Sequence, residues 1–509
     1  MALFEISLPR SVAKALRLPM RSPRRQQIRV LKKLLKRARF TEFGQQYRFD
    51  EILLDSQPVK KFRDLVPAFN YNKIYEQWWH RTLEGKRDVC WPGKVKYFAL
   101  SSGTSEASSK YIPVTADLMK GNRIVMLKQL LTLRNYTNFP VRTIGKGWLL
   151  ISGSTDLQKG PGYYAGDLSG ITTKRLPFWF NPFYKPGKKI ARQKDWNKKL
   201  DEIVEKAPGW DISFIIGVPA WIQMVMEKII ERYHLHSIHD IWPNLTLFVH
   251  GGVSFEPYKK GFEKLLGKPL IYIETYLASE GFLAYQDSQS AGGGMRLVTN
   301  EHIFFEFVPF DDANFDADGN MTEQSQTLMI NEVEEGKDYA ILISTSAGAW
   351  RYLIGDTIRF TNKERAEIII TGRTKHFLSL VGEHLSVDNM TRAIQMVSNE
   401  MNVSIPEFTV AGVSHNSGFS HDWFVGSNDA IDAGLLCKKI DANLQSLNDD
   451  YAVERKSELI DIRVQVFPEQ KFIDFMSRQG RVGGQHKFPR VLKGKMYEDW
   501  KEFIAGSNG

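Results

Sequence analysis

The 509-residue sequence contains two cysteines, Cys90 and Cys437, which lie far apart in the chain. So few cysteines exclude a disulfide framework and favour a reducing compartment, although a single bridge stays open. No apolar run reaches the roughly eighteen residues that a membrane-spanning helix needs. The N-terminal segment MALFEISLPRSVAKALRLPMR lacks the apolar stretch and small-residue cleavage site of a signal peptide. We therefore expect a soluble, cytoplasmic protein.

Several binding signatures are missing as well. The sequence has no G-x-x-x-x-G-K-[ST] loop, no zinc-finger spacing and no RNA-binding aromatic motif. The formal net charge is nevertheless +10, and part of the excess lies in residues 17–40. This basic run either binds nucleic acid or a membrane, or forms the solvated face of a helix. We favour the helix, because Ile28, Leu31, Leu34 and Leu35 form an apolar stripe opposite the charges.

The rest of the composition is that of a globular protein, with 42% hydrophobic and 25% charged residues. Its length exceeds one hydrophobic core, so we expect two or more domains. Strand-like runs alternate with helical patterns through the first 370 residues, which predicts an α/β fold. The predicted strands lie at 147–154, 210–218, 245–252, 269–281, 302–310, 339–345, 357–361 and 366–372. Helices are predicted after Pro219 and near 256–266.

The pattern changes after residue 372. A strand-like run at 408–414, a helix near 429–447 and a strand near 460–467 predict a second, smaller α/β unit. We therefore divide the chain into a large N-terminal domain, 1–371, and a smaller, mobile C-terminal domain, 372–509.

One short loop gives the first indication of a phosphate-binding site. In YFALSSGTSEASSKYIPVT, residues 97–115, a strand-like run is followed by eight residues that are almost all small, and then by Lys110. Small residues let backbone N–H groups approach an anion, and a lysine adds a positive charge for phosphate. The alternative is a solvated hairpin tip, since serine and glycine are ordinary loop residues. The loop alone leaves both interpretations open.

Three further segments carry side chains that suit a nucleotide. In ETYLASEG, 274–281, Tyr276 could cover a purine, Ser279 could donate to phosphate and Glu280 could bind a hard cation. In WRYLIGD, we expect Asp356 on a turn, where its carboxylate suits ribose hydroxyls. The fourth segment, GRTKHFLSLVGEHL, lies at the expected domain boundary. Each also has an ordinary structural interpretation, such as core packing, a helix cap, a turn or a surface ion pair.

In this order the segments resemble the adenylate-forming superfamily, and within it the GH3 family of acyl acid amido synthetases. The GH3 phosphate loop is matched by Ser101, Ser102, Gly103, Thr104, Ser105 and Lys110. The Tyr-x-x-Ser-Glu motif is matched by Tyr276, Ser279 and Glu280, preceded by Thr275, and Tyr-x-x-Gly-Asp by Tyr352, Gly355 and Asp356. The hinge motif is matched by Gly372, Arg373, Lys375 and Gly382. The C-terminal GGQHKFPR resembles the family's Gln-x-Lys-x-Pro-Arg segment.

The resemblance spans nearly the whole chain and is closer to bacterial-type members than to the plant hormone enzymes. One departure is that Glu106 and Ala107 stand where the family loop usually continues to a glycine. The methyl group of Ala107 narrows the range of backbone conformations that this position can adopt. The carboxylate of Glu106 would repel phosphate if it pointed into the loop. This departure puts the affinity for ATP, though not the fold, in question.

The resemblance implies a role for each matched residue. The 101–105 loop would cradle the β- and γ-phosphates of ATP, and Glu280 would hold Mg²⁺. Tyr276 would pack on adenine opposite Gly252 and Val253, beside Thr275 and Ser279. Asp356 would fix the ribose, and Arg373 would reach ribose or phosphate. We also place Phe304 in this site, at the edge of an acyl pocket formed with 115–133 and 218–224. Lys487 would be the catalytic lysine, in preference to Lys495, and Lys375 the hinge.

The implied activity is that of a ligase that uses ATP and Mg²⁺. A carboxylate would attack the α-phosphorus of ATP to give an acyl-adenylate and pyrophosphate, and an amine, typically of an amino acid, would then give an amide and AMP. The expected partners are these small molecules, without nucleic acid, membrane or obligate protein partner. Three alternatives stay open: an acyl-CoA ligase, a catalytically weak nucleotide-binding sensor, and a basic nucleic-acid-binding protein.

Overall fold

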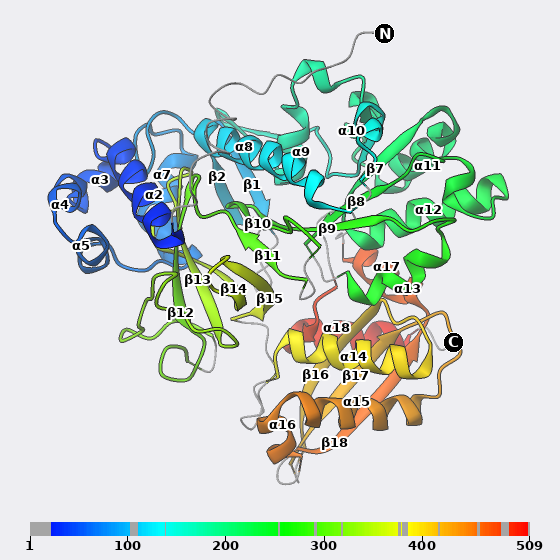
Figure 1. Cartoon of the computed structure of the whole chain (residues 1–509). Helices are drawn as coiled ribbons and strands as arrows, with labels where there is room; N and C mark the ends of the chain where they lie inside the picture. The colour runs from blue at the N-terminus through cyan, green and yellow to red at the C-terminus, as the bar shows by residue number, and fades with distance from the viewer. Residues whose placement is uncertain are drawn as a thin grey trace.

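The computed structural model describes residues 22–101, 110–137, 139–252, 255–289, 293–316, 319–374, 378, 385–415, 418–455, 459–479 and 488–506. Figure 1 shows a large body formed by the first three quarters of the chain and a smaller one below it. Both bodies combine helices with sheets, so the predicted α/β fold is confirmed. Within these ranges no helix is both long enough and apolar enough to cross a membrane. The domain boundary at residue 372 stays a prediction.

The large body is built on a mixed sheet, in which eleven strands fall within the described ranges. In spatial order these are β12 (Ile303–Pro309), β13 (Asp338–Thr345), β14 (Tyr352–Asn362), β15 (Glu367–Arg373), β11 (Met295–Leu297), β10 (Gly281–Tyr285), β9 (Ile271–Ala278), β8 (Leu247–Gly251), β7 (Ile212–Gly217), β3 (Gly147–Leu150) and β6 (Tyr184–Lys185). The strands from β9 to β6 are parallel, and those from β12 to β9 are antiparallel.

The parallel half has the alternation that the sequence predicts. Its helices include α8 (Ala116–Thr132), α9 (Leu168–Lys174), α10 (Lys188–Ala191), α11 (Trp196–Lys206), α12 (Pro219–Tyr233) and α13 (Glu256–Lys264). Pro219 is the first residue of α12, where its missing N–H group has no intrahelical partner to lose. The antiparallel half departs from the expected alternation, since β9 to β15 follow one another with no helix among the described residues between them. Antiparallel neighbours join by short turns and need no crossover helix.

A second sheet holds the ends of the small-residue loop. Its described strands are, in order, β2 (Lys110–Val114), β1 (Tyr97–Ser101), β5 (Tyr163–Gly166) and β4 (Gln158–Gly160). Strands β1 and β2 pair antiparallel, with Ser101 opposite Lys110. The next helix, α8, begins after Thr115, whose hydroxyl accepts a hydrogen bond from the N–H group of Leu118 at 3.1 Å. Threonine is favoured at this position, because its side-chain oxygen can accept from an N–H group of the first helical turn.

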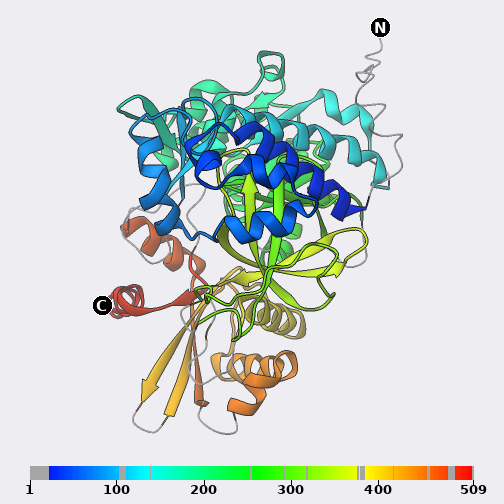
Figure 2. The ribbon, with the colours of Figure 1, turned by 90° about the vertical axis from the view of Figure 1, so that its left-hand side faces the viewer.

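A group of short helices covers the antiparallel half of the sheet (Figure 2). They are α2 (Pro23–Ala38), α3 (Glu42–Gln46), α4 (Phe49–Leu54), α5 (Pro58–Leu65), α6 (Tyr71–Ile74) and α7 (His80–Leu83). In α2 the side chains of Leu31, Leu34 and Leu35 are buried, so residues 23–38 of the basic run form the amphipathic helix that we favoured. Gln27 on the buried face donates to the carbonyl groups of Thr299 and Ile303 at 2.9 and 3.0 Å, which fastens α2 to the sheet beside β12.

The small body has its own sheet and two cores. Its described strands are, in order, β18 (Leu459–Phe467), β17 (Gly418–Gly426), β16 (Glu407–His415) and β19 (Val491–Leu492). Its helices are α14 (Val387–Met401), α15 (Ala433–Leu447), α16 (Asp449–Glu454), α17 (Glu469–Arg478) and α18 (Gly494–Ala505). Helices α14 and α15 share one core with the sheet, and α17 and α18 share another. The sequence predicted β16, β18 and α15 but missed β17, which packs against both cores.

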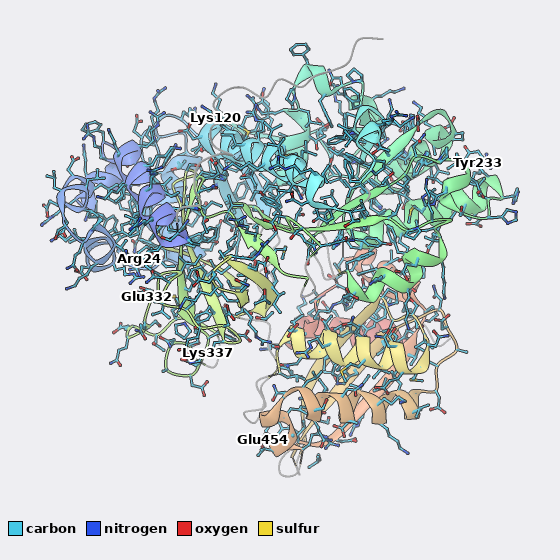
Figure 3. All side chains as sticks on the ribbon, in the orientation of Figure 1. Arg24, Lys120, Tyr233, Glu332, Lys337 and Glu454 are labelled. Atoms are coloured by element: carbon cyan, nitrogen blue, oxygen red, sulfur yellow. The ribbon has the colours of Figure 1, made fainter. Side chains whose placement is uncertain are left out.

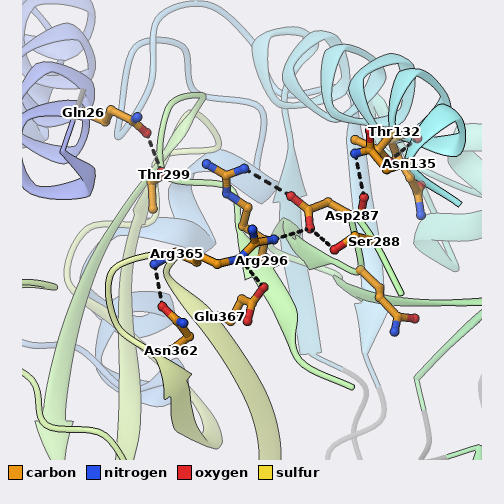
Figure 4. A network of polar contacts seen from close by, with 12 residues as sticks. Gln26, Thr132, Asn135, Asp287, Ser288, Arg296, Thr299, Asn362, Arg365 and Glu367 are labelled. Carbon is orange, nitrogen blue, oxygen red and sulfur yellow. Dashed lines mark hydrogen bonds and ion pairs between the residues drawn. The ribbon is translucent and has the colours of Figure 1, made fainter. Parts of the chain in front are cut away.

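A network of ion pairs closes the seam between β10, β11 and β15 (Figure 4). Asp287, just after β10, accepts from Arg296 of β11 and from Arg365 before β15, each at 3.1 Å. Arg365 also donates to Glu367 at 2.6 Å. Strand β11 is only three residues long and forms few backbone hydrogen bonds with its neighbours. The ion pairs therefore help to hold it between β10 and β15. Charged side chains elsewhere, such as those of Arg24 and Lys337, project from the periphery (Figure 3).

We expect Glu306→Ala to destabilise the large body by about 3–5 kcal/mol, the cost of removing one partner from a buried ion pair. The Glu306 side chain on β12 is 1% exposed and accepts from Arg63 at 2.9 Å and from Arg351 at 3.0 Å. Urea unfolding measures the change. The control is Glu334→Ala, which breaks an exposed pair with Lys337 and should cost less than about 1 kcal/mol. Equal losses in the two variants would contradict this prediction.

Candidate active site

Three of the predicted site residues form one hydrogen-bonded group. The hydroxyl of Tyr276 on β9 donates to Oδ2 of Asp356 on β14 at 2.5 Å. Nε of Arg373 at the end of β15 donates to Oδ1 of the same carboxylate at 2.8 Å. Asp356 and Arg373 are also opposite each other in the β14–β15 ladder. The sequence therefore placed together three side chains that come from separate segments.

The group exists because the sheet curls. Strands β10, β11 and β15 lie between β9 and β14. In a flat sheet this order would place β9 and β14 about 19 Å apart, at about 4.8 Å between neighbours. The direct bond from Tyr276 to Asp356 requires the antiparallel half to fold round on itself. The resulting concave side holds the candidate site.

Asp356 differs from its prediction in one respect. We expected it on a turn, but it lies within β14, in register with Arg373. Gly355 before it has φ +89°, a conformation that glycine adopts without the strain of a Cβ atom. The ladder shifts register just after Thr357. The irregular strand thus presents the carboxylate as a turn would, while the ladder fixes its position.

Glu280 lies beside this group, in the tight turn between β9 and β10. It is 7% exposed, and burial raises the pKa of its carboxyl group to about 7. The charge of Asp356 raises this pKa further, whereas Arg373 and Lys110 lower it. Neutral pH is therefore close to the point at which this side chain gains its charge. A cation bound here would favour the carboxylate form.

The start of β2 adds a further charge to the site. Nζ of Lys110 lies over the ring of Tyr71, 5.3 Å from its centroid. The hydroxyl of Tyr71 accepts a hydrogen bond from the N–H group of Tyr111 at 2.9 Å. Tyr71 thereby links α6 to the strand that follows the small-residue loop. Sequence reasoning missed Tyr71, because an isolated tyrosine in a helical segment gives no functional signal.

Tight contact between β8 and β9 fixes the opposite wall. The hydroxyl of Thr275 donates to the carbonyl group of His250 at 2.9 Å. A Cβ atom on Gly251 would lie 2.3 Å from the carbonyl oxygen of Thr275, so this position needs glycine. Thr275 therefore has a structural role beside the nucleotide role that we predicted, and that role stays a prediction. Gly252 continues the wall with φ +87°.

His250 is a second residue that the sequence reasoning missed. It is buried, and burial lowers the pKa of its imidazole to about 4. Among the described residues, its Nδ1 atom has no hydrogen-bond partner. The available signal was its position directly before Gly251 and Gly252 at the end of a strand. A neutral imidazole at this strand end is a candidate for contact with a ligand.

The remaining predicted residues do not join the group in the described structure. Phe304 on β12 is fully buried, and its ring packs edge-to-face on Phe62, so its contacts are those of a core residue. Ser279 lies in the β9–β10 turn, and Lys495 is exposed in the first turn of α18. The backbone of Ser101 ends β1. Outside the described residues lie Ser102, Gly103, Thr104, Ser105, Glu106, Ala107, Val253, Lys375 and Lys487.

The segments expected around the acyl group are divided among several cores. Leu118 of α8 packs in the core of the antiparallel half, Val125 in a small separate cluster, and Trp221 of α12 in the core of the parallel half. These contacts account for the apolar residues as ordinary packing. The acyl pocket stays a prediction.

The group fits a nucleotide with a magnesium ion. A carboxylate has about four lone-pair positions, and Tyr276 and Arg373 each occupy one on Asp356, so others could accept from ribose hydroxyls. Within the described ranges no cluster of three or more His, Cys, Asp or Glu side chains could hold a metal. Mg²⁺ is commonly held by one or two carboxylates together with substrate phosphates, so a single Glu280 suffices. The buried, readily charged state of Glu280 suits this role.

Comparison with known families gives matches to three consecutive parts of the chain. Residues 12–203 match the model of the GH3 family N-terminal domain. Residues 296–368 match the GH3 family central domain, and residues 388–495 match the GH3 family C-terminal domain. Together these three matches cover most of the chain. The candidate residues Asp356 and Lys487 fall within the central and C-terminal matches.

Known relatives and solved structures agree with the family models. The chain is 22% identical to jasmonoyl–L-amino acid synthetase JAR6 of Nicotiana attenuata, over 91% of this chain and 90% of the relative. It is 28% identical to indole-3-acetic acid-amido synthetase GH3.4 of Arabidopsis thaliana, over 58% of this chain and 50% of the relative. The fold is similar to that of the GH3.15 acyl acid amido synthetase, with a TM-score of 0.76. The two sequences are 15% identical, and the match covers 97% of this chain and 95% of the synthetase. The structure of a 2-hydroxyisobutyryl-CoA ligase is similar with a TM-score of 0.59. The two sequences are 12% identical, and the match covers 95% of this chain and 91% of the ligase.

Proposed function

Because the chain belongs to the GH3 family, we propose that it is an ATP-dependent acyl acid amido synthetase, a ligase that joins a carboxylic acid to an amine. The named relatives are amido synthetases that act on small acids and amino acids. The observation that supports the proposal in this chain is the hydrogen-bonded group of Tyr276, Asp356 and Arg373 beside the buried Glu280. That the chain is of the bacterial type stays a prediction.

In the first half-reaction a substrate carboxylate oxygen forms a bond to the α-phosphorus of ATP, and the bond from this phosphorus to pyrophosphate breaks. Two anions must approach each other, so positive charge and alignment matter more than a base. Arg373 and Lys110 supply positive charge within the described site. Asp356 orients the ribose, and Tyr276, held by its bond to Asp356, stays in place beside the adenine.

Mg²⁺, when bound at Glu280, would neutralise charge on the phosphate oxygens. The small-residue loop begins at Ser101 and ends at Lys110, which are cross-strand neighbours. The loop therefore enters and leaves at one point near Glu280, because Lys110 lies close enough to affect the pKa of that side chain. We propose that this loop holds the outer phosphates and that Lys487 adds positive charge from the C-terminal segment.

In the second half-reaction the nitrogen of a neutral amine attacks the acyl carbonyl carbon. The bond from this carbon to the AMP oxygen breaks, and the nitrogen releases a proton to solvent. The products are an amide and AMP. The acyl-adenylate is a mixed anhydride, so the amine needs mainly proximity to react. We propose an amino acid as the acceptor.

The test is an ATP–pyrophosphate exchange assay with a panel of aromatic and aliphatic carboxylic acids. We expect exchange that depends on one class of acid and on Mg²⁺. The productive acid is then offered with each amino acid and, separately, with coenzyme A, and the products are identified by mass spectrometry. An amide product supports the proposal. A thioester would instead make the protein an acyl-CoA ligase, and ATP binding without exchange for any acid would favour a sensor.

A further inference from the structure

A buried polar cluster joins the two bodies at a distance from the candidate site. The hydroxyl of Tyr258, on α13 of the large body, donates to Oε1 of Glu407 at the start of β16 in the small body. Nη1 of Arg490 donates to Oε2 of the same carboxylate at 2.8 Å and to the carbonyl oxygen of Phe408 at 2.9 Å. We call Tyr258, Glu407 and Arg490 the interdomain clamp.

The clamp is shielded from water. Tyr258 is 4% exposed, and the side chains of Glu407 and Arg490 are 18% and 15% exposed. Burial raises the pKa of Tyr258 well above its ordinary value, with a further contribution from Glu407, so the hydroxyl stays protonated and donates. Hydrogen bonds to a charged partner in such a setting are worth about 10- to 100-fold in an equilibrium. The clamp therefore has the strength to select one arrangement of the two bodies.

The neighbouring surfaces add only a few contacts to the clamp. Helices α13 and α14 lie side by side across the interface (Figure 1). Lys260 donates to the carbonyl oxygen of Ser398 at 2.7 Å, and Gln395 donates to Glu256 at 3.0 Å. A groove of about 320 Å³ lies between these helices, and these same four residues are part of its lining. The Gln395–Glu256 contact is exposed, so water competes with it more than with the buried clamp.

Arg490 also fixes the segment that runs into β19. Its guanidinium lies 4.4 Å from the centroid of the Phe408 ring, and its carbonyl oxygen accepts from the N–H group of Val410 at 3.0 Å. The hydroxyl of Thr409 donates to the carbonyl oxygen of Pro489 at 2.7 Å. Residues 488–492 are therefore held along β16. In the sequence, this segment follows directly after Lys487.

The same combination of side chains occurs within each body. Tyr276, Asp356 and Arg373 form it in the large body. In the small body, the hydroxyl of Tyr451 donates to Asp441 at 2.8 Å, and Arg455 pairs with Asp441 at 2.8 Å. The clamp alone among these three groups crosses from one body to the other. The small-body group is thus a matched control for its chemistry.

We propose that Tyr258, Glu407 and Arg490 are positioning residues that hold the segment 488–492 against the large body for the adenylation step. The inference rests on the proposed function, because the step it serves is the one that uses ATP. None of its three side chains belongs to the candidate group of Tyr276, Asp356 and Arg373. It acts through the chain that continues from Lys487, and α13, which carries Tyr258, begins four residues after Gly252 of the candidate site. Because α13 follows Gly252 so closely, a contact between segment 488–492 and α13 holds this segment near the proposed nucleotide site.

The first experiment is hydrogen–deuterium exchange on the full chain without substrates, comparing wild type with Tyr258→Phe and Tyr451→Phe. Each variant loses one hydroxyl and keeps its ring. We expect the N–H groups of Arg490, Val491 and Leu492 to exchange about tenfold faster in Tyr258→Phe and to be unchanged in Tyr451→Phe. Glu407→Gln, which keeps the shape and removes the charge, should match Tyr258→Phe. Unchanged protection of 488–492 in both clamp variants would overturn the clamp, whatever the protein catalyses.

The second experiment separates the two half-reactions. With the acid found in the panel, Tyr258→Phe should lower kcat for ATP–pyrophosphate exchange about tenfold with KM for ATP unchanged. Its rate of amide formation from supplied acyl-adenylate should stay within about twofold of wild type. In a Lys487→Ala background the further effect of Tyr258→Phe should disappear, because both act through one segment. Equal losses in both half-reactions, or additive losses in the double variant, would overturn the positioning role. Absence of ATP–pyrophosphate exchange in wild type would instead refute the proposed function. The contact between the clamp and segment 488–492 would then be tested by hydrogen–deuterium exchange alone.

Discussion

Asp356→Ala is expected to lower acid-dependent ATP–pyrophosphate exchange at least about 100-fold. The substitution removes the proposed acceptor for the ribose and leaves Tyr276 and Arg373 without their shared partner. Each lost hydrogen bond to this carboxylate is worth about 1.5–3 kcal/mol, and each 1.4 kcal/mol that is lost from transition-state stabilisation is a factor of ten in rate. The measurement is kcat/KM for ATP in the exchange assay, with ATP affinity measured separately by calorimetry.

The control for this variant is Asp338→Ala. Asp338 on β13 accepts from Arg359 on β14 at 2.9 and 3.0 Å, within the same antiparallel half of the sheet. We expect it to lower stability and to leave exchange within about threefold of wild type. Near-normal exchange in a folded Asp356→Ala protein would show that this carboxylate does not orient the nucleotide.

Glu280→Gln is expected to abolish Mg²⁺-dependent exchange and at the same time to stabilise the protein without ligands. Burial raises the pKa of Glu280 from an ordinary value of 4.5 to about 7. The folded state therefore binds its proton more tightly than the unfolded state does, so ionisation destabilises the fold as pH rises from about 4.5 to 7. Glutamine does not ionise, and its advantage should reach about 3 kcal/mol above pH 7, at about 1.4 kcal/mol per pKa unit.

Thermal unfolding between pH 4.5 and 8 measures this advantage. The gain in Tm should grow up to pH 7 and then stay level. Glu274→Gln is the control, because burial also raises the pKa of Glu274 to about 7 on the neighbouring strand. It should show a similar stability profile with exchange retained. A Glu280→Gln variant that is no more stable at pH 8 than wild type, or that keeps Mg²⁺-dependent exchange, would contradict the assignment of this side chain.

Local sequence patterns were sufficient for most of the large body. Alternating apolar runs predicted β3, β7, β8 and β9, and Pro219 marked the start of α12, because such signals act within a few residues. The antiparallel order of β10 to β15 was not predictable in this way. Antiparallel pairing depends on partners distant in sequence, and each short strand alone is compatible with either type of neighbour. The missed strand β17 has the same explanation.

The order of the motifs identified the family and predicted the side chains of the candidate group. Such motifs can be recognised because a backbone requirement, such as glycine before Asp356, restricts the residue type at its position. Their roles stay predictions. Sequence alone gave no signal for Tyr71 or for the clamp of Tyr258 and Glu407, because each depends on contacts between distant segments. For His250 the position before two glycines at a strand end was a signal that the sequence reasoning did not use.

The sequence by itself determined the α/β class and the family, because periodicity and motif spacing are local properties of the chain. The site residues that it proposed stay predictions. The tertiary structure alone decided that Tyr276, Asp356 and Arg373 meet, since that contact needs the curl of a sheet across three intervening strands. It also decided that Phe304 packs in the core and that Glu280 is buried enough to titrate near neutral pH. Burial and long-range contact are collective properties of the packed chain, and short segments do not encode them.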